Sequence, residues 1–269
     1  MNYNIKLAQN YWASRINNKK QDLASVLYYS EPIIVNQAYD KWEKTIIGNE
    51  ICQRRYKNIL DLPVGIGRWS SNFLPLCEKL YCVDVADEVL SFAHNNLKSA
   101  GDKVKYIKSD VCSLSSTTGL KFDLILCTGL FEHLPEDNYL EAVDKFLEML
   151  NDNGEFILVV NNENSVYLQD KNYNNFRGSE QQKNGYFNNI TDLKKVVSKI
   201  EQKISIKNYS TNPNFSVLRH CLKLNTNTDT RGIETLFQQA LEYDVKFFAK
   251  KTTPLDVLSD QVVIWSCKT

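Results

Sequence analysis

The sequence predicts an α/β protein with a doubly wound, mostly parallel sheet. Short apolar runs rich in branched residues alternate with helix-forming segments through the middle of the chain, a pattern typical of parallel strands joined by crossover helices. The early runs end in polar residues, and the first opens into a turn with two glycines. A chain of 269 residues can bury a substantial core, so we expect one enlarged domain rather than two independent ones.

The expected strands are short and form two groups. Five follow one another with helices or loops between them, and two candidates come late in the chain. The strands are expected at 59–61, 80–85, 104–110, 122–127 and 155–160, and the later candidates at 203–209 and 261–266.

Helices are expected before the first strand and between most of the later ones. Pro32 interrupts the N-terminal pattern, Pro75 ends the short helix after the glycine turn, and Gly101 closes the next helix. The helices are expected at 7–15, 22–47, 68–75, 87–98, 137–150, 191–200 and 231–248, the last being an insertion before the final strand. Residues 163–189 are polar and aperiodic, which indicates a long loop or lid.

Composition and charge exclude several classes of protein. Hydrophobic residues make up 43% and charged residues 24% of the chain, as in ordinary globular proteins. The 32 basic and 32 acidic side chains cancel, which argues against a dedicated nucleic-acid binder. No apolar run approaches the roughly 18 residues of a membrane helix, and the N-terminus lacks the apolar part of a signal peptide. We therefore expect a cytoplasmic protein without membrane or nucleic-acid partners, and the oligomeric state stays open.

The seven cysteines indicate neither a metal site nor a disulfide framework. Their number is odd, and no two are spaced as Cys-x-x-Cys. We expect reduced, buried thiols and no bound metal.

The most informative segment is 58–69, which reads NILDLPVGIGRW. An apolar strand ends near Asp61. The chain then passes through a turn that contains Gly65 and Gly67 and enters a helix. Because glycine lacks a Cβ, such a turn can be tight and its backbone can approach a ligand, while the helix start offers N–H groups. Short Gly-x-Gly turns also occur in loops that bind nothing, so the turn alone does not establish a ligand site.

Residues at the ends of the following strands strengthen the ligand interpretation. Asp84 comes 23 positions after Asp61, close to the spacing of about 20 residues at which a carboxylate meets ribose hydroxyls. Asp110 ends the third strand and is followed by the apolar Val111, a pairing that suits an adenine amino group and ring. The fourth strand opens into residues 128–133, at the edge where open α/β sheets bind ligands. An NAD site stays open as an alternative, although the third glycine of the dinucleotide fingerprint would fall at Ser70.

This ordered series resembles the class I S-adenosylmethionine-dependent methyltransferases over roughly residues 50–162. The resemblance implies a Rossmann-like sheet of seven strands with an antiparallel last strand. It also implies that the glycine turn wraps the methionine part of the cofactor, Asp84 holds the ribose, and Asp110 with Val111 holds the adenine. Pro63 departs from the usual glycine and removes one backbone N–H. The cofactor-binding residues expected are Arg15, Asp61, Pro63, Gly65, Gly67, Asp84, Val85, Asp110, Val111 and Thr128.

The N-terminal segments 11–15 and 36–42 are similar to small-molecule methyltransferases encoded with bacterial surface-polysaccharide pathways. This resemblance implies methylation of an oxygen of a sugar, phosphate or phosphoramidate group in capsule or surface-polysaccharide biosynthesis. Arg15 lies three residues after Trp12, on the same helix face, and either grips the cofactor carboxylate or is surface charge. The alternatives for function are a nucleotide-dependent oxidoreductase, a non-catalytic binding protein, and a methyltransferase acting on a protein or another metabolite.

Four residues are candidates for chemistry on the acceptor side. His133 follows the fourth strand, and because an imidazole titrates near neutral pH it is either the general base or a structural residue. Arg177 in the expected lid suits an anionic acceptor, since a guanidinium pairs two phosphate oxygens. Tyr39 and His220 are further candidates for substrate binding.

The chain is expected to divide into three parts. Residues 1–49 would form an N-terminal helical cover, and 50–162 the S-adenosylmethionine-binding core. Residues 163–269 would supply the lid loop, a substrate-side insertion and the remaining core strands.

Overall fold

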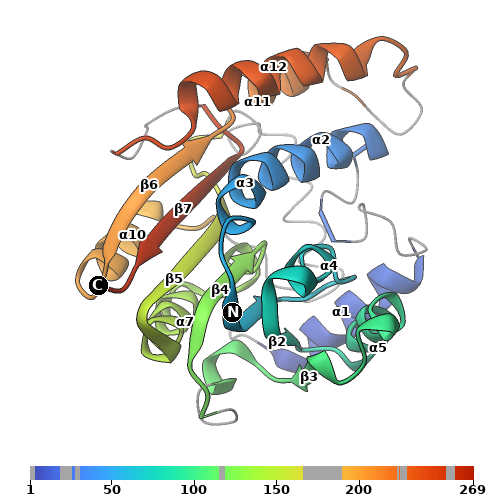
Figure 1. Ribbon diagram of the computed structural model, residues 1–269. Helices are drawn as coiled ribbons and strands as arrows, with labels where there is room; N and C mark the ends of the chain where they lie inside the picture. The colour runs from blue at the N-terminus through green and yellow to red at the C-terminus, as the bar shows by residue number, and fades with distance from the viewer. Residues whose placement is uncertain are drawn as a thin grey trace.

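The computed structural model describes residues 4–18, 26–27, 31–114, 119–165, 190–222, 224, 229–252 and 258–269. Seven strands form one sheet in the order β3-β2-β1-β4-β5-β7-β6 (Figure 1). β7 runs antiparallel to β5 and β6, while the pairs among β1 to β5 are parallel. The predicted mostly parallel, seven-stranded sheet with an antiparallel last strand is therefore confirmed. The strands are β1 (Tyr56–Leu62), β2 (Cys77–Asp84), β3 (Val104–Lys108), β4 (Phe122–Thr128), β5 (Leu150–Asn161), β6 (Ser205–Thr211) and β7 (Gln261–Cys267).

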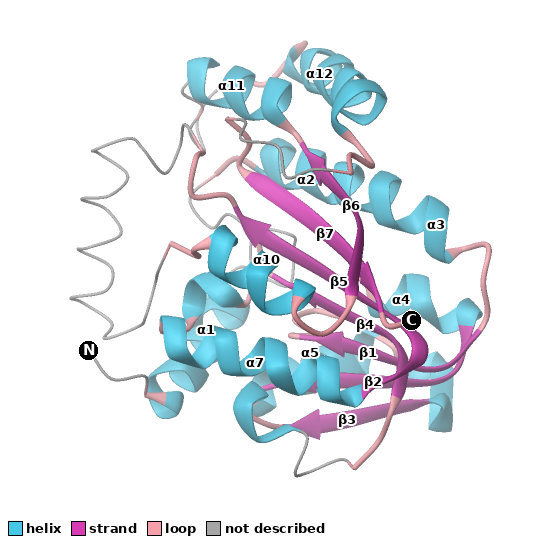
Figure 2. Ribbon diagram, turned by 90° about the vertical axis from the view of Figure 1, so that its left-hand side faces the viewer, coloured by secondary structure: helices cyan, strands magenta, loops and turns pink. Residues whose placement is uncertain are grey.

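Helices cover both faces of this sheet (Figure 2). The α-helices are α1 (Ile5–Asn18), α2 (Ile33–Glu43), α3 (Asn49–Ile51), α4 (Ser70–Phe73), α5 (Asp87–Asn96), α7 (Glu136–Met149), α10 (Leu193–Glu201), α11 (Pro213–Leu222) and α12 (Ile233–Phe248). Shorter turns are the π-helix η2 (Lys44–Gly48) and the 3₁₀ helices η3 (Leu74–Leu76), η4 (Lys98–Lys103), η5 (Val111–Ser113) and η6 (Phe131–His133). None of the helices in these ranges is long and apolar enough to cross a membrane.

The core consists of two apolar layers, one on each face of the sheet. Successive side chains of a strand point to opposite faces. Ile59 therefore belongs to the layer that includes residues of α2, α5 and α12, whereas Leu60 belongs to the layer that includes residues of α7 and α10. Ile157 and Leu158 of β5 divide between the layers in the same way. Strands buried on both faces read as continuous apolar runs, which is the pattern that predicted them.

The insertion before the last strand consists of two helices, α11 and α12, joined by a buried carboxylate. Asp244 of α12 accepts hydrogen bonds from the backbone N–H groups of Asn214 and Phe215 at 3.0 Å each, and from the Asn214 side chain at 2.7 Å. It therefore satisfies N–H groups at the start of α11, which an isolated helix leaves without partners. Burial raises the pKa of Asp244, and these donors oppose that rise.

Several element boundaries differ from the sequence prediction. β3 ends at Lys108, so Asp110 does not end the strand; its side chain accepts from the Cys112 N–H at 3.2 Å and caps the short helix η5. β5 begins at Leu150 rather than at 155, directly after α7. The helix after the glycine turn begins at Ser70 rather than at 68, because Gly67, with φ +79°, keeps the chain in a turn.

The topology places a ligand site at one edge of the sheet. From β1 the chain proceeds outward through β2 to β3, then returns to the other side of β1 for β4 and β5. The point where the strand order reverses, between β1 and β4, leaves a crevice at the carboxyl ends of the strands, where open α/β sheets bind ligands.

Candidate functional site

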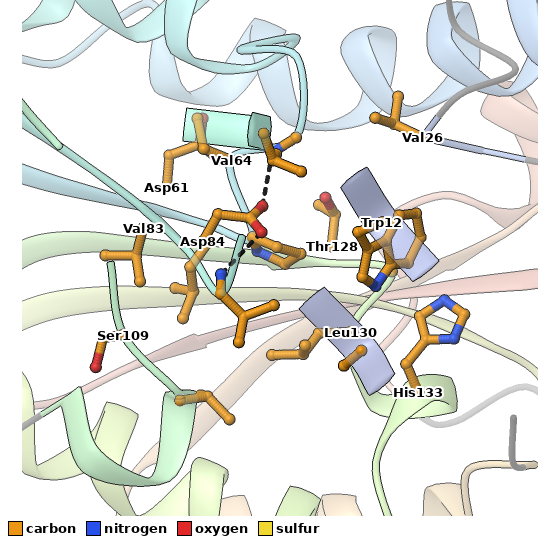
Figure 3. A pocket seen from close by; sticks show the side chains of 18 of the residues that line it. Trp12, Val26, Asp61, Val64, Val83, Asp84, Ser109, Thr128, Leu130 and His133 are labelled. Atoms are coloured by element: carbon orange, nitrogen blue, oxygen red, sulfur yellow. Dashed lines mark hydrogen bonds between the residues drawn. The ribbon is translucent and has the colours of Figure 1, made fainter. Parts of the chain in front are cut away.

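A pocket lies at this reversal point, formed by the ends of four strands and covered by α1 (Figure 3). The space in and in front of it amounts to about 980 Å³, including the part that is open to solvent. Its lining residues are Ala8, Trp12, Ile16, Val26, Asp61, Leu62, Pro63, Val64, Gly65, Arg68, Trp69, Val83, Asp84, Val85, Val89, Ser109, Asp110, Val111, Thr128, Gly129, Leu130, His133 and Leu134.

The turn after β1 forms one wall of the pocket. Gly65 and Gly67 have φ angles of +53° and +79°, values that side-chain-bearing residues rarely adopt. A Cβ on Gly65 would lie 2.9 Å from Cγ1 of Val26, so the absent side chain is also needed for space. The Leu62–Pro63 peptide bond is cis, and the next residue, Val64, donates its N–H to the Val83 carbonyl at 2.8 Å. The turn is thereby joined to β2.

Asp84 is held at the end of β2 by three backbone N–H groups. Its Oδ1 accepts from Val85 at 2.8 Å and from Ala86 at 3.3 Å, and its Oδ2 accepts from Gly65 at 3.3 Å. Burial raises the pKa of this carboxyl to about 6, although the three donors favour the ionised form. A carboxylate offers about four acceptor positions, so a hydroxyl donor in the pocket can still bind. Both the predicted Asp84 and the predicted Val85 line the pocket.

Asp61 is the most deeply buried carboxyl group of the pocket wall, with 2% of its surface exposed. Its Oδ2 accepts from the Ser70 hydroxyl at 2.5 Å, and that hydroxyl also lies 3.3 Å from the Cys82 sulfur. Burial raises the pKa of Asp61 to about 7, against the Ser70 hydrogen bond and the positive charge of Arg68, which lower it. A cationic group bound beside it would favour the ionised carboxylate.

Arg68 is a pocket-lining residue that the sequence prediction did not include. Its Nη1 lies 3.0 Å from Oδ1 of Asp40 and 2.7 Å from Oε2 of Glu43, both on α2. Asp40 also pairs with Lys44 at 2.8 Å. No local pattern in the sequence identifies Arg68 as a site residue. Its partners Glu43 and Asp40 lie 25 and 28 residues upstream, on a helix whose packing cannot be deduced from the residues around Arg68.

A second wall comes from the ends of β3 and β4. Ser109, Asp110 and Val111 line the pocket after β3, and Thr128 lines it after β4. Burial raises the pKa of the half-buried Asp110. An apolar side chain next to a carboxylate suits a ring that carries a hydrogen-bond donor.

His133 lines the pocket beside Trp12 (Figure 3). The two ring centroids are 5.1 Å apart, and the ring planes make an angle of 81°. Trp12 comes from α1, whose residues Ala8, Trp12 and Ile16 line the pocket at a spacing of four. That periodicity is a signal that could have identified Trp12 as a site residue. The geometry allows the imidazole to contact a molecule bound against Trp12.

Arg15, predicted to grip a carboxylate, contacts residues outside the pocket lining. Its guanidinium lies 5.0 Å from the centre of the Trp12 ring, donates to the Leu27 carbonyl, and contacts the Tyr11 hydroxyl at 3.3 Å. Within the described residues, Arg15 and Gly67 do not line the pocket. The predicted shared face of Trp12 and Arg15 is present, but Trp12 occupies the pocket side of it.

Tyr39, predicted to bind substrate, belongs to a buried polar network. Its hydroxyl donates to Asp260 and accepts from Nη1 of Arg219 at 2.7 Å. Arg219 also contacts Asp260 at 2.8 Å and Glu31 at 2.7 Å. Ser165, at the start of the segment expected to form a lid, donates to the same Asp260. The network joins α2, α11 and the start of β7.

The other two acceptor-side predictions lie elsewhere. His220 is on α11, outside the pocket lining of the described chain. Arg177 lies outside the described residues.

The strand order and the position of the pocket define the Rossmann-like fold of the class I methyltransferases. Residues 59–154 match the family model described as a methyltransferase domain. The chain is 30% identical over 80 residues to the ubiquinone biosynthesis O-methyltransferase of Nitrosospira multiformis, a match that covers 30% of this chain and 34% of that protein. The match therefore spans about a third of the curated relative.

Two solved structures show the similarity of fold. The magnesium protoporphyrin IX methyltransferase of Synechocystis PCC 6803, with bound S-adenosylhomocysteine, has a TM-score of 0.61 and 8% identity, covering 98% of this chain and 99% of that chain. The N-methyltransferase NodS of Bradyrhizobium japonicum WM9, in complex with S-adenosylhomocysteine, has a TM-score of 0.55 and 11% identity, covering 94% and 98%.

Proposed function

We propose that this chain is an S-adenosylmethionine-dependent methyltransferase acting on a small molecule. The observation that carries the proposal is the Asp84 carboxylate, which three backbone N–H groups fix beside the glycine turn and which lines the pocket at the carboxyl ends of the strands. The methyltransferase-domain match over residues 59–154 covers this turn and this carboxylate.

The residues present fit the proposed cofactor. Gly65 leaves a cradle that a Cβ would fill, and Asp84 has acceptor capacity for ribose hydroxyls. Asp110 and Val111 pair a half-buried carboxyl with an apolar surface, which suits adenine. When bound, the cofactor supplies an activated methyl group. The work of the protein is then to position the acceptor and exclude water, and Trp12 and Leu130 offer apolar walls for this.

For the acceptor we propose an oxygen atom of a small molecule. His133, which lines the pocket beside Trp12, would take the proton of a hydroxyl, which is a poor nucleophile near neutral pH. An ionised phosphate or phosphoramidate oxygen would need only orientation. The N-terminal similarity described above favours a sugar, phosphate or phosphoramidate group of a surface or capsular polysaccharide pathway.

Calorimetry with S-adenosylhomocysteine and with NADH tests this function. We expect binding of S-adenosylhomocysteine and none of NADH. Binding of NADH alone would instead identify a nucleotide-dependent oxidoreductase.

Mass spectrometry identifies the acceptor class. Incubating S-adenosylmethionine with a panel of sugars, phosphorylated sugars, amines and proteins should add one methyl group to a small molecule. Methylation of proteins alone would refute the small-molecule proposal.

A further inference from the structure

Val26 lies against the glycine turn, although it comes from the N-terminal part of the chain. It belongs to a short segment, residues 26–27, that is neither helix nor strand, and its half-buried side chain lines the pocket (Figure 3). A Cβ on Gly65 would lie 2.9 Å from Cγ1 and 3.6 Å from Cβ of Val26. The turn and Val26 thus leave no room for a side chain between them, and both line the space that a ligand would occupy.

Arg15 of α1 ties segment 26–27 to that helix. Its Nη2 donates to the Leu27 carbonyl, and its Nη1 donates to the Tyr11 hydroxyl at 3.3 Å. The guanidinium lies 5.0 Å from the centre of the Trp12 ring, and the residue is 8% exposed. A guanidinium carries five N–H donors in fixed directions. One buried side chain can therefore contact its own helix and the segment at the same time.

α1 is in turn attached to the residues that follow β2. Ile16 packs with Ala86 and Val89, and the Gln9 side chain donates to the Val85 carbonyl at 3.0 Å. The helix that carries Arg15 is therefore joined to the same strand end that holds the carboxylate proposed for ribose.

Leu27 attaches the segment to a second part of the molecule. While its carbonyl accepts from Arg15, its side chain packs against the core layer that includes residues of α2. Segment 26–27 thus joins α1 to that layer, with Val26 at the glycine turn. Loss of the Arg15 hydrogen bond would leave the attachment through the Leu27 side chain alone among these two.

We infer that Arg15 is a positioning residue: it fixes segment 26–27 at the glycine turn, so that Val26 retains a cofactor bound there. The inference rests on the proposed function. It replaces the sequence prediction that Arg15 itself grips the cofactor carboxylate, because among the described residues Val26 lines the pocket and Arg15 does not. Weakening the attachment should shorten the lifetime of the complex without removing a contact to the carboxylate.

Stopped-flow dissociation of two ligands tests this role, with the fluorescence of Trp12 and Trp69 in the pocket lining as the signal. S-adenosylhomocysteine carries the carboxylate, whereas S-adenosyl-3-thiopropylamine is the same molecule without it. Arg15→Met removes the hydrogen bond to the Leu27 carbonyl, so both ligands should dissociate faster by the same factor, about 3- to 30-fold. An effect on S-adenosylhomocysteine alone would show that Arg15 contacts the carboxylate. That result, or unchanged rates for both ligands, would overturn the inference.

A double-variant cycle with S-adenosylhomocysteine alone tests whether Arg15 acts through Val26. Val26→Ala shortens the side chain at the turn and should by itself speed dissociation. If Arg15 acts through the segment, combining Arg15→Met with Val26→Ala should speed dissociation little beyond the more affected single variant, because coupled residues are not additive. Additive effects would show that Arg15 acts independently of Val26 and would contradict the inference.

Lys6→Met is the matched control for charge. It removes an exposed positive charge from the same helix, and both ligands should dissociate at the wild-type rates. An acceleration as large as in Arg15→Met would assign the effect to the net charge of α1 and would refute the positioning role.

If Arg15→Met does not fold, Arg15→Lys and Val26→Ala decide. Lysine keeps the charge but lacks the planar fork, so Arg15→Lys should also speed the dissociation of both ligands equally. Wild-type rates in both variants would refute the inference. Wild-type protein that binds neither ligand would refute the proposed function itself.

Discussion

The backbone N–H of Gly65 donates to Oδ2 of Asp84 across 3.3 Å, which joins the turn after β1 to the end of β2. The hydrogen bond crosses between two parallel strands at their carboxyl ends, where Asp61 pairs with Cys82 in the last recorded register position. It fixes the carboxylate that we propose for ribose relative to the turn that we propose for the methionine part of the cofactor.

Replacing Asp84 by Asn should weaken S-adenosylhomocysteine binding by about 10- to 100-fold. The amide keeps one acceptor oxygen but turns a donor toward Gly65, so both the turn and the ligand lose a partner. Asp87→Asn is the matched control, since this exposed carboxylate lies three residues away and pairs only with Lys108 among the described residues. Calorimetry on both variants decides; equal losses would contradict a specific role for Asp84.

Asp61→Asn should make the ligand-free protein more stable above neutral pH. Burial raises the pKa of Asp61 to about 7 in the folded protein, while the unfolded chain ionises near 4. The folded state therefore keeps the Asp61 carboxyl protonated up to a higher pH than the unfolded chain does. As a result, the free energy of unfolding falls as the pH rises from about 4 to 7. Between pH 5 and 8 the wild type should lose up to about 3 kcal/mol relative to the variant. Urea unfolding at the two pH values measures this, and a constant difference would contradict it.

Gly65→Ala should lower both stability and ligand affinity. The new Cβ meets Val26 at 2.9 Å and the residue must keep φ +53°, which costs about 1–2 kcal/mol from the backbone alone. Gly232→Ala is the control, because Gly232 is also left-handed but a Cβ there meets nothing within 4 Å. The control should lose stability and keep the affinity for S-adenosylhomocysteine. Thermal unfolding and calorimetry separate the two effects.

His133→Ala should lower turnover on a hydroxyl acceptor by about 10²- to 10⁴-fold, the usual contribution of a general base. Affinity for S-adenosylhomocysteine should change much less than turnover, because we assign His133, which packs beside Trp12, to the acceptor and not to the cofactor. His94→Ala, which removes an exposed imidazole on α5, serves as the control. Steady-state kinetics with the acceptor found by mass spectrometry is the measurement. Near-normal turnover would leave His133 with a structural role.

The sheet could be predicted from the sequence because its signals are local. The central parallel strands β1, β4 and β5 contain apolar runs. Of the residues that predicted a ligand site, Gly65, Asp84 and Thr128 line one pocket, whereas Gly67 does not. These residues meet because parallel strands bring their carboxyl ends to one edge, which needs only the topology. The roles assigned to them stay predictions, as does the division of the chain into three parts.

The contacts made by the covering helices could not be predicted. Trp12 and His133, which are in contact, lie 121 residues apart in the sequence, and the hydrogen-bonded Tyr39 and Asp260 lie 221 residues apart. Such pairs depend on how helices pack on the finished sheet, and a local pattern gives the exposed or buried face of a helix but not its partner. This is why Tyr39 was expected to meet a substrate, and why Arg68 was overlooked.

The adjacent residues Tyr39 and Asp40 tie α2 into two different buried charge networks, one with Asp260 and Arg219 and the other with Arg68. Moving α2 would break both at once. α1 covers the pocket from another direction: Ile16 packs with Ala86 and Val89, and the Gln9 side chain donates to the Val85 carbonyl at 3.0 Å. Because Arg68 lines the pocket, a shift of α2 would be transmitted to the pocket wall through the ion pair between Asp40 and Arg68.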